Sequence, residues 1–165
     1  MPKIKADFSF FVFAALIFLL KDKYTACGFV MVCALHETGH FAAIVIFRAK
    51  IKMLRFSASG IRIETEKSGI VPIYRSIIIL LSGPAANIIL FILLEFSGRY
   101  HQTALLSLAA GLYNLLPYRQ LDGGSAIELL LTGSLHEREL RTILKIVRVC
   151  IPLAVLFIMM HERQF

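Results

Sequence analysis

The sequence predicts an all-α polytopic membrane protein, a bundle of four to six transmembrane helices with a small β-hairpin or sheet after the second apolar segment. Hydrophobic residues make up 58% of the 165 residues, well above the roughly 45–50% apolar content of soluble domains. The mean hydropathy is +0.74, and several runs are apolar enough for a bilayer to be their solvent. A chain of this length is expected to form a single membrane-embedded domain, residues 1–165.

The first two apolar segments lie at residues 8–20 and 24–47. The N-terminus resembles a secretory signal, with a basic start and an apolar core. No small-x-small cleavage site precedes the next apolar run, so we expect a retained first span or anchor. The second segment exceeds the ~20 residues that a transmembrane helix needs.

A basic loop separates the second and third apolar segments. Residues 48–75 hold seven basic residues, opposed only by Glu64 and Glu66: Arg48, Lys50, Lys52, Arg55, Arg62, Lys67 and Arg75. An excess of Lys and Arg predicts a cytoplasmic loop. The stretch IKMLRFSASGIRIE alternates in part around residues 57–60, which favours a hairpin with a glycine-containing turn. An irregular basic loop is the alternative.

Three further apolar segments follow, at residues 76–94, 101–117 and 143–160. The first of them is uncharged and is the clearest transmembrane helix, although Gly83 and Pro84 interrupt it. The last carries Lys145 and Arg148 near its start, so we expect that end to lie at the membrane interface.

The net charge of +7 does not indicate nucleic-acid binding. The basic residues fall between apolar runs and are not interleaved with aromatic residues along one soluble surface. Attraction to anionic lipid headgroups accounts for this pattern, so the expected partner is the lipid bilayer.

The second apolar segment contains the unit His36-Glu37-x-x-His40. Residues four apart lie on one face of a helix, so both imidazoles can reach a single ion. Zinc accepts two imidazoles, one further protein ligand and a water. Zinc lowers the pKa of a bound water from ~15.7 towards ~7, and Glu37 can take the proton of that water and pass it to a leaving amine. The alternative is a pair of structural histidines between helices, but ionisable groups at membrane depth favour a functional site.

A third zinc ligand must come from another part of the chain. The candidates are Glu95, Asp7 and Asp122. Asp122 follows an apolar segment that Pro117 must break, and the glycines after it permit unusual backbone geometry. Asp122 is equally suited to be the N-cap of a short helix GSAIELLL, and spacing alone does not decide between the two roles.

The two motifs together resemble those of the site-2 proteases, zinc metalloproteases that cut substrates within or beside the membrane. The second motif is Asn114-x-x-Pro117-x-x-x-Leu121-Asp122-Gly123-Gly124. The resemblance implies one zinc per chain, held by His36, His40 and Asp122, with Glu37 as general base. It also implies that Asn114 orients the substrate or stabilises the oxyanion, for which a side-chain amide is suited. Capping of the broken helix is the alternative role of Asn114.

The same resemblance implies a substrate and a setting. The second motif is most similar to the bacterial branch that includes a sporulation protease acting on a sigma-factor precursor. The expected substrate is therefore a membrane-associated regulatory protein, a sigma-factor precursor or an anti-sigma factor. The expected location is the cell membrane, with several spans and an active site nearer the cytoplasmic face. Inhibitory or regulatory membrane proteins are further expected partners, whereas 165 residues leave no room for a PDZ or CBS module.

The resemblance also gives the predicted hairpin a use, because an extended substrate segment can add to its edge as a strand. A transmembrane substrate must unwind before hydrolysis, which favours substrates with helix-weakening residues near the cut.

Two other functions fit the same residues. One is a catalytically silent membrane scaffold that binds client helices. The other is a metal transporter in which His36, His40 and Asp122 form a transit site. A transporter does not need Glu37, so the substitution Glu37→Gln separates transport from proteolysis.

Overall fold

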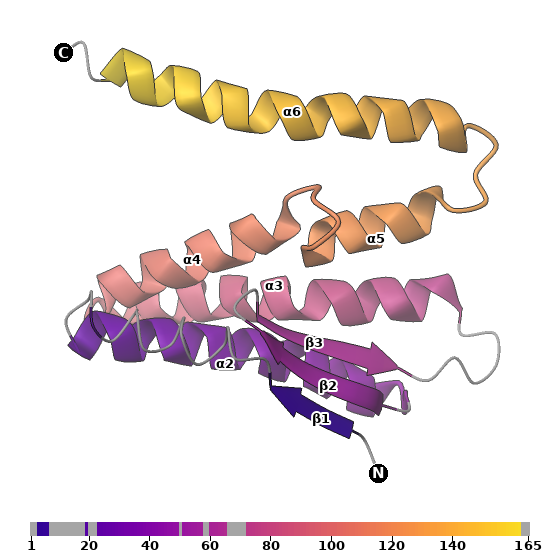
Figure 1. Cartoon of the computed structure of the whole chain (residues 1–165). Helices are drawn as coiled ribbons and strands as arrows, with labels where there is room; N and C mark the ends of the chain where they lie inside the picture. Colours follow the sequence, from indigo (N-terminus) through magenta and orange to yellow (C-terminus); the bar gives the residue numbers. More distant parts are fainter. Residues whose placement is uncertain are drawn as a thin grey trace.

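Figure 1 shows the computed structural model of the chain, which describes residues 3–6, 19, 23–49, 51–57, 60–65 and 72–162. Helices α2 to α6 and strands β1 to β3 lie in this described part. The predicted first span, residues 8–20, lies outside it except for residue 19.

Helix α2 runs over Lys23–Ile46 and corresponds to the second predicted apolar segment. It ends in a left-handed turn at Arg48, where φ is 51°. The N–H of Ala49 donates to the Ile44 carbonyl at 3.0 Å, and the N–H of Arg48 donates to the Val45 carbonyl at 3.0 Å. These bonds satisfy carbonyls that a helix end leaves unpaired, as a glycine C-cap usually does.

The strands form one small sheet in the order β1-β2-β3. Strands β2 (Ile51–Ser57) and β3 (Gly60–Thr65) pair antiparallel, as a hairpin requires. Residues 58–59, where its predicted turn falls, lie outside the described residues. Strand β1 (Lys3–Ala6) pairs with β2 in parallel, a pairing that the sequence did not predict. Figure 1 shows this sheet beside α2.

Helices α3 (Ile73–Ser97) and α4 (His101–Leu115) pack against each other and against α2. Small residues line these contacts. A Cβ atom at Gly39 of α2 would lie 2.5 Å from the Ser82 carbonyl oxygen of α3. The buried residues of α4 are equally small: Ala104, Ser107 and Gly111. Close approach of helix backbones through small residues is typical of packing in membranes.

Most large apolar side chains of these helices point outward. Phe41, Val45, Ile89, Leu93 and Phe96 are all exposed. By contrast, the largest fully buried side chains are modest in size: Ile44, Val32, Asn87, Pro84 and Ser107. A soluble protein rarely exposes a contiguous apolar surface of this kind, so the pattern fits a lipid environment.

Two helices in the described part are long and apolar enough to cross a membrane, namely Lys23–Ile46 and Ile73–Ser97. Within their apolar windows only 28% and 17% of residues are buried, so neither is the enclosed core helix of a soluble protein. Helix α4 has 15 residues, about 22 Å at 1.5 Å per residue, which is shorter than a ~30 Å hydrocarbon core.

Helix α5 (Asp122–Leu131) is short, and α6 (Glu137–Glu162) follows it on the side of the molecule away from the sheet. A group that we call the Glu128 cluster connects them. The Glu128 carboxylate forms ion pairs with guanidinium groups from the turn before α5 and from α6: Arg119 at 3.1 Å, Arg148 at 3.0 Å, and Arg141. Arg148 also donates to the Pro117 carbonyl, so α6 contacts the turn that leads to Asp122.

Candidate metal centre

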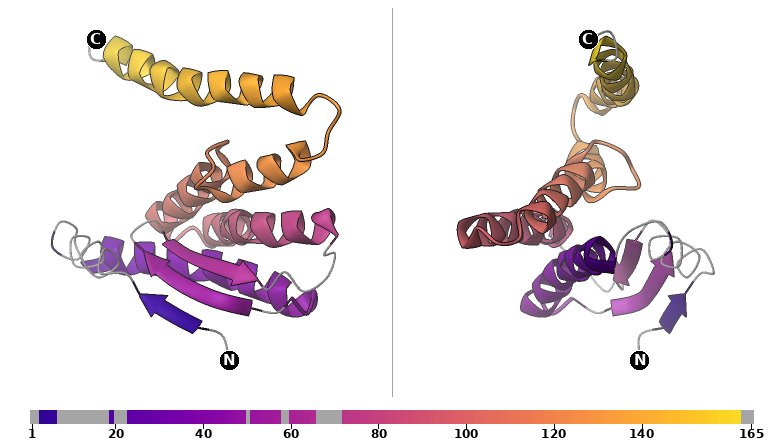
Figure 2. Two further views of the ribbon diagram at one scale, coloured as in Figure 1. Left: turned by 45° about the vertical axis from the view of Figure 1, so that its right-hand side comes forward. Right: turned by 90° about the vertical axis from the view of Figure 1, so that its left-hand side faces the viewer.

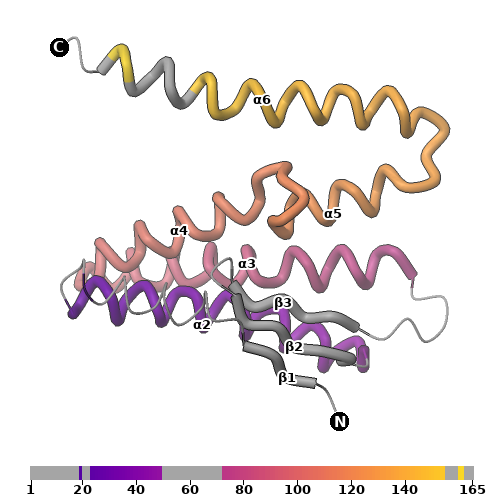
Figure 3. The backbone as a smooth tube through the Cα atoms, viewed as in Figure 1, coloured from indigo at the N-terminus to yellow at the C-terminus, as the bar shows by residue number. Residues whose placement is uncertain are grey.

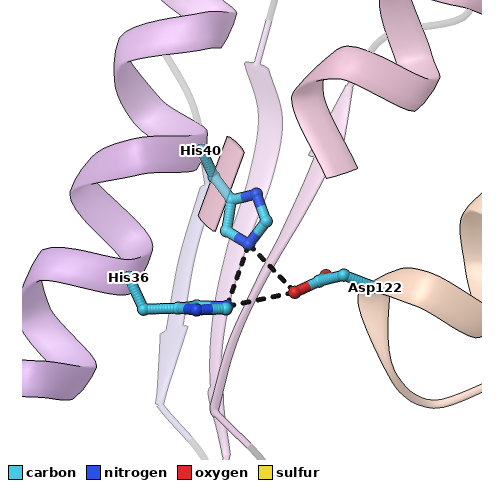
Figure 4. Close-up of side chains that lie close together, drawn as sticks. All are labelled: His36, His40 and Asp122. Carbon is cyan, nitrogen blue, oxygen red and sulfur yellow. Dashed lines mark hydrogen bonds and ion pairs between the residues drawn. The ribbon is translucent and has the colours of Figure 1, made fainter. Parts of the chain in front are cut away.

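Three of the predicted site residues meet at one point. Figure 4 shows His36 and His40 projecting from α2 towards Asp122 at the start of α5. The Asp122 Oδ2 atom lies 3.0 Å from His36 Nε2 and 3.3 Å from His40 Nε2. The two Nε2 atoms are 3.1 Å apart. Residues 86 positions apart in sequence thus form one cluster of nitrogen and oxygen atoms.

The cluster is largely enclosed by protein. His36 and His40 are each 7% exposed, and the Asp122 side chain is 20% exposed. The two rings meet edge to face, with centroids 4.8 Å apart. One helical turn separates the two residues, which explains why both rings reach the same point.

The turn between α4 and α5 (Figure 3) leads directly to Asp122, whose carboxylate faces the two histidines. Helix α4 ends at Leu115, before Pro117, and the Leu121 N–H donates to the Tyr118 carbonyl at 2.9 Å. The two glycines after Asp122 allow this turn to lie directly on α5. A Cβ atom would lie 2.2 Å from the Leu115 carbonyl oxygen at Gly123 and 1.9 Å from the Tyr118 carbonyl oxygen at Gly124.

Asp122 is the first residue of α5 and not its N-cap. The N-cap is Leu121, and no side chain caps the helix there. The Asp122 carboxylate instead faces the two imidazoles. This arrangement favours the ligand role of Asp122 over the capping role that the sequence left equally open.

Of the other two candidates for a third ligand, Glu95 is not in the cluster. Glu95 lies at the end of α3, where its carboxylate is 3.1 Å from the His101 ring. Asp7 lies outside the described residues.

The two predicted catalytic residues lie on α2 and α4. Glu37 is half-buried and directly follows His36. Asn114 is half-buried in the last turn of α4, and its Nδ2 donates to the Ala110 carbonyl at 3.0 Å. This bond lies within the last turn of α4. It agrees with the alternative role of Asn114, which is capping of the broken helix.

Helix α3 supports both histidines, which sequence reasoning missed. His40 Nδ1 donates to the Ile79 carbonyl at 2.7 Å. Asn87 Nδ2 lies 3.2 Å from His36 Nδ1. A Cβ atom at Gly83 would lie 2.3 Å from His40 Nε2. The sequence did contain one signal of this support, the polar amide of Asn87 in the uncharged run 76–94. Such a group needs a hydrogen-bond partner in an apolar surrounding.

The donor atoms suit zinc. Two ligand atoms at ~2.0–2.1 Å from a tetrahedral zinc ion lie about 3.3 Å apart. The three separations here are 3.0, 3.1 and 3.3 Å. Two imidazoles and one carboxylate also match the ligand set of catalytic zinc sites, which leave a fourth position open.

Comparisons with known proteins gave one curated relative and one solved structure of note, while no family model matches the chain. Stage IV sporulation protein FB of Bacillus subtilis (strain 168) is 29% identical over 144 residues. The match covers 79% of this chain and 50% of that protein, so the chain spans about half the length of the curated relative.

The solved structure is the Site-2 Protease from Methanocaldococcus jannaschii. It matches with a TM-score of 0.67 and 21% sequence identity, over 82% of this chain and 70% of that chain. This likeness concerns the fold. The fold and the relative in sequence support the resemblance to the site-2 proteases that the two motifs predicted.

Proposed function

We propose that the chain is an intramembrane zinc endopeptidase that cuts a peptide bond within or next to a transmembrane segment of a regulatory protein. The observation that carries this proposal is the meeting of His36, His40 and Asp122 in one enclosed cluster on a helix that also bears Glu37. A carboxylate beside two imidazoles of a His-x-x-x-His pair is the arrangement of a zinc peptidase.

His36, His40 and Asp122 would hold the zinc ion. When bound, zinc supplies Lewis-acid chemistry that polarises a peptide carbonyl and makes water acidic enough to lose a proton near neutral pH. Glu37 accepts that proton on a carboxylate oxygen and returns it to the nitrogen of the leaving amine. No covalent bond between the chain and the substrate is needed.

Asn114 is proposed to orient the substrate or to stabilise the oxyanion. Asn114 lies three residues before Pro117, and its amide donates to the Ala110 carbonyl. Rotation of the side chain away from that carbonyl would free the amide to donate to a substrate oxygen.

The chain is proposed to cross the cell membrane several times. The outward-facing apolar side chains of α2 and α3 support this placement. The seven basic residues of the loop 48–75 support a cytoplasmic position for that loop. The end of α2 nearer the proposed metal site would then lie towards the cytoplasmic face.

The proposed substrate is a membrane-tethered sigma-factor precursor or anti-sigma factor, cut where its helix is weak. The similarity to a sporulation protein supports this class. Substituting Leu for helix-weakening residues near the cut would slow cleavage, because helical carbonyls are occupied by hydrogen bonds.

Co-expression with such a substrate tests the proposal. Cleavage is compared between the wild-type chain and Glu37→Gln on a gel, with zinc measured in both purified proteins. Loss of a general base is expected to slow cleavage by roughly 10²–10⁴-fold. Zinc is expected to stay at about one per chain, because Glu37 is not a ligand.

The same pair of proteins separates the alternatives. Cleavage by Glu37→Gln at the wild-type rate would contradict the catalytic role and favour a scaffold. Zinc transport into vesicles that survives Glu37→Gln, without any cleavage by the wild type across a panel of tethered substrates, would favour a transporter.

A further inference from the structure

Asn87 lies at the centre of the helix packing and contacts the metal centre directly. It is fully buried on α3, in the middle of an uncharged run. Its side-chain amide lies 3.2 Å from His36 Nδ1. Its backbone carbonyl accepts a hydrogen bond from Ser107 of α4 at 2.9 Å. A buried amide in such a position requires a physical reason, because an unpaired polar group costs free energy in an apolar surrounding.

The chemistry of imidazole limits what Asn87 can do. A neutral imidazole carries one N–H and one lone pair, and a metal binds the lone pair. The nitrogen of His36 that faces Asp122 and His40 is Nε2. Zinc binding through Nε2 therefore requires a hydrogen on Nδ1, and that hydrogen requires an acceptor.

His40 shows how this requirement is met. Its Nδ1 faces the Ile79 carbonyl at 2.7 Å, and a carbonyl can only accept, so the hydrogen lies on Nδ1. The lone pair of neutral His40 is then on Nε2, which points into the cluster. For His36 the group at Nδ1 is the Asn87 amide, which has one oxygen and one nitrogen.

The two orientations of the Asn87 amide select different forms of His36. With Nδ2 towards His36, the amide donates to Nδ1, which places the hydrogen of neutral His36 on Nε2 and blocks that atom as a ligand. With Oδ1 towards His36, the amide accepts from Nδ1–H and leaves Nε2 free to bind a metal. Asn87 Oδ1 is buried and has no hydrogen-bond partner among the described residues.

We propose that Asn87 is a positioning residue for His36, whose Oδ1, after a half-turn of the amide, accepts from His36 Nδ1–H and so fixes the tautomer that binds metal through Nε2. This inference rests on the proposed zinc site. It assigns to α3 the partners of both histidines, the Ile79 carbonyl for His40 and the Asn87 amide for His36. Partners of this kind typically change metal affinity by about 10–100-fold.

Zinc affinity of the purified chain in detergent tests the inference, with a chelator of known affinity as competitor. Asn87→Leu keeps similar bulk without an acceptor and is expected to bind zinc ~10–100-fold more weakly. Asn87→Asp keeps an acceptor and is expected to bind zinc at least as tightly as the wild type. The visible spectrum of the cobalt-loaded protein is expected to be preserved in Asn87→Asp and altered in Asn87→Leu.

Ser107→Ala is the matched control. It removes a buried hydrogen bond to the backbone of Asn87 without touching the imidazole. It is expected to lower the thermal unfolding temperature but to leave zinc affinity within about twofold, since no partner of a ligand changes. An equal loss of zinc affinity in Ser107→Ala and Asn87→Leu would overturn the inference, because packing alone would then explain both.

Nitrogen NMR of zinc-loaded wild-type protein provides a readout that does not require any variant to fold. A hydrogen on His36 Nδ1 supports the inference, and a hydrogen on Nε2 overturns it. If the wild type binds zinc but Asn87→Leu binds it equally well, only this inference fails. If the wild type binds no zinc, the proposed function fails with it.

Discussion

The absence of a side chain at Gly83 leaves the space that the His40 ring occupies. The ring occupies the volume that a Cβ atom at this position would need, because such an atom would lie 2.3 Å from His40 Nε2. The ring cannot move aside freely, since its Nδ1 donates to the Ile79 carbonyl at 2.7 Å. Gly83 therefore has a steric role at the candidate metal centre in addition to its place in a helix that Pro84 interrupts.

Gly83→Ala is expected to displace the His40 ring and to weaken zinc binding by at least tenfold. Overpacking of this kind also costs about 1–3 kcal/mol of stability. Chelator competition and thermal unfolding of the purified protein measure the two effects. Gly28→Ala is the control, because the nearest atom there, at 3.1 Å, is Thr103 Oγ1 and no residue of the site is involved. Wild-type zinc affinity in Gly83→Ala would contradict this account of the packing.

Sequence reasoning predicted the three residues of the cluster but not the residues that support them. Helical spacing predicted the pair His36 and His40, and the resemblance to the site-2 proteases added Asp122 as the third ligand. Spacing did not decide between Asp122 and Glu95, since that choice depends on which helix ends meet in space. The contact of Asn87 with His36 joins residues 51 positions apart, and a single sequence does not show such a pair.

Among the helices, α5 lies between the candidate metal centre and α6, and the Glu128 cluster connects it to α6. The Arg119 guanidinium is the main reason that the pKa of Glu128 is lowered from 4.5 to about 2. Burial acts in the opposite direction, and Arg148 and Arg141 contribute further lowering. Because Asp122 begins α5, this cluster also limits the movement of a proposed zinc ligand.

The cluster is expected to hold α5 and α6 together at any pH above about 4.5. A carboxylate with a lowered pKa stabilises the fold in its ionised form, and that contribution is lost as the pH falls from 4.5 towards about 2. Hydrogen exchange of the α5 and α6 amides is therefore expected to show equal protection at pH 7 and pH 5, after correction for intrinsic rates.

Glu128→Gln is expected to increase exchange in both helices at pH 7, because three guanidinium groups then lose a charged partner. Glu139→Gln, a change to an exposed carboxylate outside the cluster, is the control. Unchanged protection in Glu128→Gln would show that the cluster does not hold the helices together.

The bounds of the long helices follow from hydropathy, but the sheet does not follow from it fully. The segments 24–47, 76–94 and 101–117 correspond to Lys23–Ile46, Ile73–Ser97 and His101–Leu115. The pairing of β2 with β3 is local and could be predicted. Strand β1 pairs in parallel with residues about fifty positions away, and four residues carry no periodic signal for such a partner.

At the scale of the whole molecule, small residues face inward and large apolar residues face outward. Ala26, Gly28, Ala104 and Gly111 line the contacts, while Phe41, Leu93 and Phe96 are exposed. Composition predicted the lipid environment, because 58% hydrophobic residues cannot all be enclosed by a chain of this size. Which residues face lipid and which face a neighbouring helix depends on the packing.

The chain is expected to stay in the membrane fraction after an alkaline carbonate wash, which removes peripheral proteins. Without detergent the purified protein is expected to aggregate, because burying its exposed apolar surface against other copies is more favourable than exposing it to water. Immunoblots of the washed fractions and size-exclusion chromatography measure the two outcomes. A monodisperse, soluble monomer without detergent would contradict the membrane placement.

Zinc content of the purified chain and of its Asp122→Ala variant decides whether the three clustered residues form a metal site. We expect about one zinc per wild-type chain and a loss of most of it in Asp122→Ala, because the carboxylate from α5 would complete the histidine pair of α2. Glu95→Ala is the matched control, since that carboxylate lies beside His101. Full zinc content in Asp122→Ala, or loss in Glu95→Ala alone, would contradict the site.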